Sequence, residues 1–323
     1  MEQPTAVLPE SVSWRLHIDR SMWVAGVRGL MLQALHPVAM QGVWQRSDFM
    51  DDPTGRLLRT ADFVATTTYG SPAEAEELGA RVRAVHRRLR FTDPETGAAR
   101  RVDDPELLLW VHCAEVVSYL EVVVRAGVRL GPGDADRYFA EQADTAAHVG
   151  LDPAQVPTSA GRMRAYLASV RPRLRGGAEA RAAVRFLLWP KVPAHMRALA
   201  PLKPLWLPVG ALAYYTLPRW ARKEYGILPE PPGTQTAVTA SLRALRTGLH
   251  ALPDDIYNRV FDEATIARAR TARRRLEAAG YDVSRGFAGL RDPGTWPVRE
   301  PTAAEPVRVR APGPAWEGPV VER

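Results

Sequence analysis

Three polar side chains share one face of a segment with helical spacing. Arg56, Arg59 and Thr60 are spaced i, i+3 and i+4, which places two guanidinium groups and a hydroxyl side by side on a helix. Phe63 and Thr67 extend the same face, so we expect it to be half-buried. A buried guanidinium needs an anionic partner, which a ligand could supply. An ordinary solvated arginine face is the alternative interpretation.

A histidine is expected to face inward from the next predicted helix. His86 stands four residues after Val82 and eight after Leu78, and these two form an apolar stripe with Val85 and Leu89. An inward histidine can hold a metal, or it can be a hydrogen-bonded core residue. The pattern alone leaves both interpretations open.

The run 107–119 is apolar on nearly every face, which predicts a helix at the centre of the fold. His112 and Glu115 lie three residues apart on it and share a face, so two ionisable groups are expected in the core. They could hydrogen-bond each other and fix the packing, or line a substrate pocket. His36 ends another apolar segment before Pro37, where it could cap carbonyl groups or point into a pocket.

Several familiar chemistries are excluded by motifs that the sequence lacks. It contains no Gly-x-Gly-x-x-Gly fingerprint, Walker loop, His-Glu-x-x-His or Gly-x-Ser-x-Gly. The one His-x-x-Glu pair, His112 and Glu115, has no second pair to complete a di-iron bundle. Cys113 is the single cysteine, which rules out an internal disulfide and a Cys-x-x-Cys-His attachment site.

Composition indicates a folded chain with a sizeable core, since 46% of the 323 residues are hydrophobic and 24% are charged. The formal charge of +7 comes mostly from scattered arginines, so we expect no nucleic-acid partner. Residues 1–10 show no signal-peptide pattern, which makes the cytoplasm the expected location. The apolar segment Pro201–Leu217 is interrupted by Lys203 and two prolines, which favours a buried helix or a peripheral membrane contact over a span.

Helical spacing dominates the chain, and strands are expected to be rare. Capping side chains at Asp52, Ser71 and Asp104 each precede a proline, and Glu74 completes a capping box with Ser71. We predict one all-α domain over residues 11–290 and a proline-rich, poorly ordered tail over 295–323. The predicted helices span residues 20–35, 53–69, 72–90, 105–127, 134–148, 159–171, 178–189, 205–216, 234–248 and 263–279.

The order of these motifs resembles a known family. The segments 32–37 (LQALHP), 56–60 (RLLRT), 82–86 (VRAVH) and 104–112 (DPELLLWVH) follow one another as in the MpaB-type oxygenases and the catalytic domain of latex clearing protein, a rubber oxygenase. The resemblance covers residues 20–250 and weakens after Pro190. It implies a globin-like helical domain that encloses a b-type haem, at which dioxygen is activated.

The resemblance also implies roles for individual residues. In the rubber oxygenases, a helix with an arginine and then a lysine-threonine pair supplies the distal side, and a histidine on the next helix is the proximal ligand. Arg56, Thr60 and His86 occupy the arginine, threonine and histidine positions here. The lysine position holds Arg59, a departure, because a guanidinium stays charged and is a poor iron ligand. The sixth iron position is therefore expected to be open or filled by water.

Together these observations predict a haem-dependent oxygenase that acts with dioxygen on an apolar, isoprenoid- or lipid-like substrate. Substrate is expected to enter near Trp206 and residues 214–215. Two alternatives stay open: a haem-free helical protein that binds an apolar ligand, and a non-haem metal oxidoreductase that uses His112, Glu115 and a further histidine. Arg59, Thr60 and Arg56 are the expected catalytic residues, His86 is the expected iron ligand, and the residues expected to bind haem b are His86, Arg56, Phe63, His112 and His36.

Overall fold

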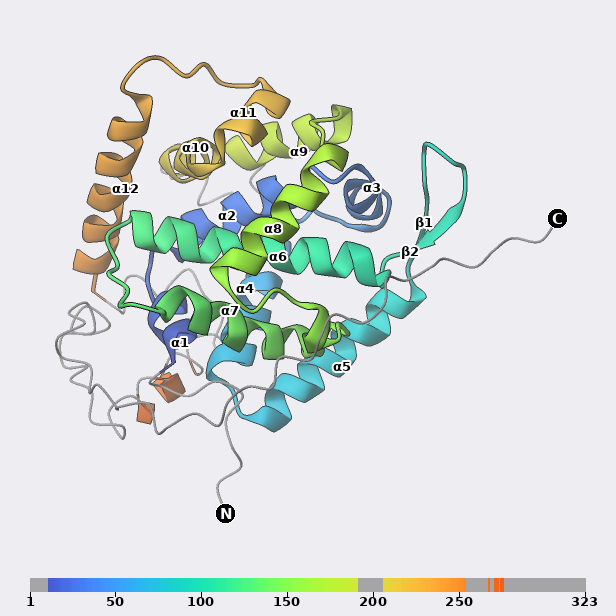
Figure 1. Ribbon diagram of the computed structural model, residues 1–323, viewed down its shortest axis with the longest axis horizontal. Helices are drawn as coiled ribbons and strands as arrows, with labels where there is room; N and C mark the ends of the chain where they lie inside the picture. The colour runs from blue at the N-terminus through green and yellow to red at the C-terminus, as the bar shows by residue number, and fades with distance from the viewer. Residues whose placement is uncertain (1–10, 191–205, 254–266, 268–269, 273, 276–323) are drawn as a thin grey trace.

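The computed structural model describes residues 11–190, 206–253, 267, 270–272 and 274–275, without the side chains of residues 53 and 54 (Figure 1). In this part of the chain the fold is all-α with one short hairpin, as the helical spacing predicted. Most of the predicted helix 263–279 and all of the predicted tail 295–323 lie outside the described residues.

Most predicted helices are present with ends that differ by a few residues. Those that begin at Asp52, Ser71 and Asp104 start where predicted, because each of these side chains accepts a hydrogen bond from a backbone N–H of the first turn. The capping box at Ser71 is confirmed. The predicted helices observed are α2 (Met22–Gln33), α4 (Pro53–Tyr69), α5 (Pro72–Arg88), α6 (Pro105–Arg125), α7 (Asp134–Thr145), α8 (Ala160–Val170), α9 (Ala178–Leu188), α10 (Trp206–Thr216) and α12 (Thr234–Ala251).

Three α-helices of the described residues were not predicted: α1 (Val12–His17), α3 (Pro37–Arg46) and α11 (Arg219–Tyr225). At α3 the interpretation of His36 as the end of a helix was incomplete. His36 is the N-cap of a new helix, and its Nδ1 accepts a hydrogen bond from the backbone N–H of Ala39 at 3.3 Å. Pro37 therefore occupies the first turn of α3, where its missing N–H costs nothing.

Helix α6 runs through the centre of the molecule and packs most extensively against α2 (Figure 1). Hydrogen bonds tie the pair, among them one from the Gln33 amide to the Val111 carbonyl at 3.0 Å and one from the Trp110 indole to the Gln33 carbonyl at 2.9 Å. Among the described residues, α6 is the one helix long and apolar enough to cross a membrane, but 72% of its apolar window is buried inside the protein. Its apolarity is therefore that of a core helix, as predicted for the run 107–119.

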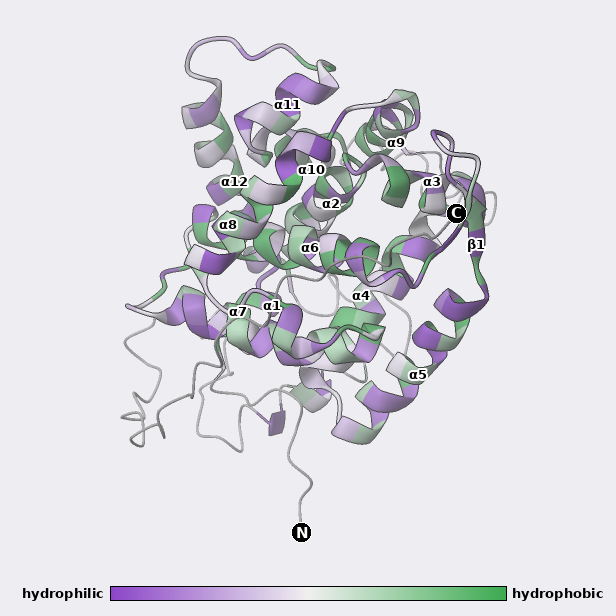
Figure 2. Cartoon of the chain, turned by 45° about the vertical axis from the view of Figure 1, so that its right-hand side comes forward, coloured by the Kyte–Doolittle hydropathy of each residue, from purple (hydrophilic) through white to green (hydrophobic). Residues whose placement is uncertain are grey.

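Helix α5 covers one side of the molecule, and Figure 2 shows mostly hydrophilic residues along it. Its buried positions are Ala75 and Gly79, and the η1 turn (Ala146–Val149) packs against this helix. Val85 is 54% exposed, so its predicted place on the apolar stripe was wrong. The helix ends at Arg88 with Leu89 as its C-cap, and the chain continues into the antiparallel hairpin of β1 (Arg90–Thr92) and β2 (Ala99–Arg101).

An ionic contact fastens α12 to the turn between α1 and α2. The carboxylate of Asp19 is buried there and accepts hydrogen bonds from Arg246 Nε at 2.6 Å and from His250 Nε2 at 3.2 Å. These partners hold the pKa of Asp19 at about 2 even though burial alone would raise it. The last helix of the 206–253 segment is thereby joined to the first turn of the domain.

Candidate active site

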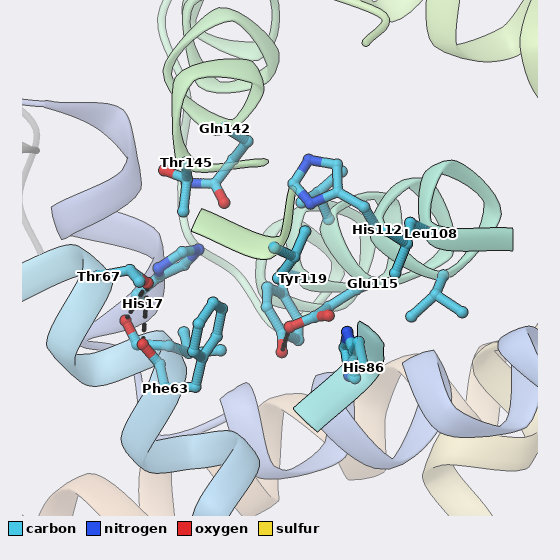
Figure 3. A pocket seen from close by; sticks show the side chains of 14 residues that line it. His17, Phe63, Thr67, His86, Leu108, His112, Glu115, Tyr119, Gln142 and Thr145 are labelled. Carbon is cyan, nitrogen blue, oxygen red and sulfur yellow. Dashed lines mark hydrogen bonds between the residues drawn. The ribbon is translucent and has the colours of Figure 1, made fainter. Parts of the chain in front are cut away.

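A cavity of about 70 Å³ lies between α6 and the helices α1, α4, α5 and α7 (Figure 3). This volume holds a few water molecules or one end of a ligand. It is well below the roughly 300–1,000 Å³ of sites that enclose a whole organic molecule. The residues that line it are His17, Phe63, Val64, Thr67, His86, Leu108, Val111, His112, Glu115, Val116, Tyr119, Gln142, Thr145 and Val149.

The α6 side of the cavity carries a carboxyl group that is hydrogen-bonded to a phenol. Tyr119 donates its hydroxyl proton to Glu115 Oε1 over 2.6 Å, one helical turn along α6 (Figure 3). Burial raises the pKa of Glu115, although the hydrogen bond from Tyr119 opposes this. Burial also raises the pKa of Tyr119. Glu115 therefore favours its neutral acid form, and Tyr119 remains a phenol.

His112 lies beside this pair and is only 9% exposed. Its imidazole makes a hydrogen bond with the backbone of Gln142. Its Nε2 is buried without a partner among the described residues, so Nδ1 is the atom left for the Gln142 bond. Burial lowers the pKa of His112 to about 4, which makes the ring neutral at physiological pH. Of the two interpretations that the sequence left open, the mutual hydrogen bond between His112 and Glu115 is not formed, and both side chains line the cavity instead.

His86 reaches the cavity from α5, as its predicted inward orientation requires (Figure 3). The side chain is half-buried, and its Nδ1 is buried without a partner among the described residues. Burial lowers the pKa of His86, Asp103 opposes that shift, and the charge of Arg56 adds to it. The cavity thus receives a second neutral imidazole. Its Nδ1 makes no hydrogen bond with the described residues that would fix its tautomer.

His17 is a lining residue that the sequence analysis did not assign to the site. It comes from the short helix α1, and Nδ1 lies 2.8 Å from Thr68 Oγ1 while Nε2 lies 3.3 Å from the Tyr138 hydroxyl. Burial lowers the pKa of His17 to about 3. Both ring nitrogens are thus occupied, and His17 closes the wall without offering a free nitrogen. The one sequence signal for α1 was the capping residue Ser11, whose hydroxyl accepts from the Trp14 N–H.

The two arginines on the predicted face of α4 lie in different surroundings: Arg56 is mostly buried, and Arg59 is exposed. The guanidinium of Arg56 donates to the hydroxyl of Ser47. Within the described part of the chain no carboxylate forms an ion pair with Arg56. Burial lowers the pKa of Arg56, with Asp48 opposing the shift. A largely desolvated cation without a bonded anion can accept a carboxylate from a ligand.

Arg59 and Thr60 do not line the cavity. The Arg59 side chain is 59% exposed and pairs with Asp48 and Asp52, each at 3.1 Å. Thr60 donates its hydroxyl to the carbonyl of Arg56 at 3.1 Å, a bond within the helix. The prediction that the whole face would be half-buried was therefore wrong at Arg59. Further along the same helix, Phe63 does reach the cavity.

The remaining predicted positions lie elsewhere. His36 caps α3 and is not among the lining residues. Trp206 donates its indole N–H to the Leu187 carbonyl at 2.8 Å, and Tyr215 donates to the Pro229 carbonyl at 2.8 Å, so neither marks an entrance to this cavity. No group of three or more His, Cys, Asp or Glu side chains in the described residues is arranged to hold a bare metal ion. The arrangement that a non-haem site would need is not formed by these side chains.

The fold and the cavity define an all-α domain with buried, neutral ionisable groups around a small chamber. Residues 14–250 match the family described as ER-bound oxygenase mpaB/B'/Rubber oxygenase, catalytic domain. The match covers well over half of the chain, and the chain belongs to this family of oxygenase catalytic domains. No curated protein and no solved structure matches the chain. The predicted resemblance is confirmed, and with it membership of an oxidoreductase class.

Proposed function

We propose that this chain is a haem b-dependent oxygenase that acts with dioxygen on an apolar substrate, and that His86 is the iron ligand. The observation that carries the proposal is the imidazole of His86 at the cavity of a domain matched to an oxygenase family. Neutral imidazole is a common axial ligand of haem iron, and burial favours the neutral form of His86.

The donor chemistry of the described residues fits haem. His86 offers a ring nitrogen at the cavity, and Arg56 offers a desolvated cation for a propionate. His86 and Arg56 lie close enough for the charge of Arg56 to lower the pKa of His86, so one cofactor could engage both. We assign His86 to the iron and Arg56 to a propionate.

The enclosed volume is smaller than a haem, so the ring needs space that helices α4 and α5 must provide. No side chain described between Gly55 and Ala65 of α4 is fully buried, whereas Thr66, Thr67 and Thr68 are buried. The first half of α4 is therefore the loosely packed part of the site. We propose that this half-helix moves when the cofactor binds.

A bound haem would supply the binding and reduction of dioxygen. The chain's own residues set the surroundings. Phe63, Val111 and Val116 line the chamber with apolar surface, which excludes water and suits an apolar substrate. Burial favours a proton on the Glu115 carboxyl group, next to the space where substrate would react. With substrate bound, the chamber would thus be shielded from water and close to uncharged, with Glu115 as a proton donor.

The other predicted residues take smaller parts. Arg59 and Thr60 do not line the cavity, so the proposal gives them no contact with reacting atoms. Phe63 and His112 line it and would contact cofactor or substrate. His36 lies outside it. We also propose a cytoplasmic location with peripheral membrane contact, and the apolar character of helix α10 supports the membrane contact.

The test is an absorption spectrum of the chain expressed with a haem precursor. The parent protein should show an intense Soret band, and His86→Ala should lose it while keeping its helical circular dichroism. His148→Ala is the matched control, because His148 is a histidine beside α5 that pairs with Glu76 outside the cavity. Equal haem content in the parent and His86→Ala would refute the assignment. A colourless parent would favour the haem-free, apolar-ligand alternative.

A further inference from the structure

The cavity wall formed by α6 offers two hydrogen-bonding atoms to which the described residues give no partner. The first is His112 Nε2, which is buried and unpartnered among the described residues. Because Nδ1 is the atom left for the backbone of Gln142, and a carbonyl oxygen can only accept, the ring proton belongs on Nδ1. Nε2 of the neutral ring then carries a lone pair, and it can only accept a hydrogen bond.

The second atom is Oε2 of Glu115. Oε1 already accepts the hydroxyl proton of Tyr119, and no arginine or lysine is among the lining residues to stabilise a carboxylate. The other titratable groups at the cavity are His17, His86 and His112, whose pKa values are all lowered by burial, so they bring no positive charge at neutral pH. A neutral Glu115 that accepts through Oε1 presents its own O–H from Oε2.

The two atoms belong to one helix face, because His112 and Glu115 are three residues apart on α6. Figure 3 shows both side chains on the same side of the cavity. The wall therefore presents one acceptor and one donor to whatever fills the space. Leu108, Val111 and Val116 supply apolar surface around them. An unpaired buried acceptor is costly, so the arrangement favours a ligand that satisfies it.

We propose that this wall binds the hydroxyl end of an otherwise apolar substrate, whose O–H donates to His112 Nε2 while its oxygen accepts from Glu115 Oε2–H. An alcohol has both functions in one atom pair, whereas an ether can only accept and a hydrocarbon can do neither. A carboxylate would meet the lone pair of His112 with no arginine or lysine among the lining residues. A chamber of about 70 Å³ suits the polar end of a molecule, with the chain extending away from α6.

This inference names the substrate class of the same cavity. It rests on the proposed function, because a bound alcohol is a substrate only if the chain is an oxygenase. Binding itself can be tested without turnover. The probes are 1-butanol, its isomer diethyl ether, and butanoate, measured by ligand-observed NMR at neutral pH on the protein as isolated. One satisfied donor–acceptor pair should give 1-butanol about ten-fold tighter binding than diethyl ether. Butanoate should bind more weakly than 1-butanol.

Four variants assign the preference to the two atoms. His112→Leu should reduce 1-butanol to the affinity of the ether, because only the alcohol donates to Nε2. Glu115→Leu should weaken 1-butanol and the ether alike and keep the preference, because both accept from Glu115 in the parent. Glu115→Gln should keep the preference, because its amide still accepts from Tyr119 and still donates into the cavity. Thr145→Val is the control, since Thr145 lines the cavity but its hydroxyl donates to the Glu141 carbonyl.

The outcomes separate this inference from the haem assignment. Equal affinities of the parent for 1-butanol and diethyl ether would overturn the hydroxyl site, whatever the Soret band shows. An unchanged preference in a folded His112→Leu would also overturn it. Loss of the Soret band in His112→Leu with the band retained in His86→Ala would make His112 the iron ligand and remove it from this role. A preference that survives in a colourless protein would support the hydroxyl site and refute only the haem.

Discussion

The neutral state of His17 leads to a testable dependence of stability on pH. In the folded protein its pKa is about 3, because burial disfavours the charged ring, whereas an unfolded histidine has the ordinary value of 6.5. As pH falls through 6.5, His17 takes up a proton in the unfolded state but stays unprotonated in the folded state. The contribution of His17 to stability is therefore present above pH 6.5 and is lost as pH falls from 6.5 towards 3.

The size of this loss follows from the two pKa values. Between pH 7 and pH 5, proton uptake by one unfolded histidine with the ordinary pKa lowers the free energy of unfolding by about 2 kcal/mol. The folded value of about 3 lies far enough below pH 5 that the folded protein takes up almost no proton in this range. Replacing His17 should therefore make the loss of stability between these two pH values about 2 kcal/mol smaller.

Urea unfolding at pH 7, 6 and 5 measures the effect in the parent and in His17→Gln. The variant is expected to be less stable at pH 7, because the contacts with Thr68 and Tyr138 are disturbed, but flatter with pH. Thr68→Val is the matched control, since it removes the hydroxyl contact and leaves the buried imidazole in place. It should retain the parental slope. An identical pH dependence in the parent and His17→Gln would refute the assignment of a neutral, buried ring.

Two further substitutions test the ionic contacts. Arg59→Ala should change the free energy of unfolding by no more than about 1 kcal/mol, because its ion pairs are exposed. Haem content and turnover should stay parental, since the side chain lies outside the cavity. Slower turnover at unchanged stability would restore the catalytic role that the family resemblance implies. Asp19→Asn should destabilise the protein by about 3 kcal/mol in chemical denaturation at pH 7, because it leaves Arg246 without its buried carboxylate, and a loss below 1 kcal/mol would show that the contact is weak.

The helices with strong local signals were predictable, and the short ones were not. A capping side chain and a proline specify the first turn independently of the rest of the fold, which is why α4 and α5 begin where expected. Helices α1 and α11 have six and seven residues, too few to show a periodic pattern. At Pro37 the sequence marks a helix boundary without saying whether one helix ends or another begins.

The site was predictable to the level of helix faces. His86 and Phe63 reach the cavity from the faces expected, and α6 brings His112 and Glu115 to it. Spacing could not decide which flank of the α4 face is covered by neighbouring helices, and Arg59 falls on the uncovered side. Spacing also could not reveal His17, because its contact with Thr68 joins two parts of the chain that are 51 residues apart in sequence. Such contacts depend on packing between helices, which sequence periodicity does not encode.

The central position of α6 divides the site into parts of different local stability. His112, Glu115 and Tyr119 sit on a helix buried over most of its length, so its amide hydrogens should exchange with solvent only on global unfolding. The described residues of α4 up to Ala65 are half-buried or exposed, so their amides should exchange through local opening at a much lower free energy. The wall that would recognise substrate would then be complete in the newly folded chain, while the side that would hold the cofactor closes later. Under the proposed function, cofactor binding would order the first half of α4 against a domain that has already folded around α6.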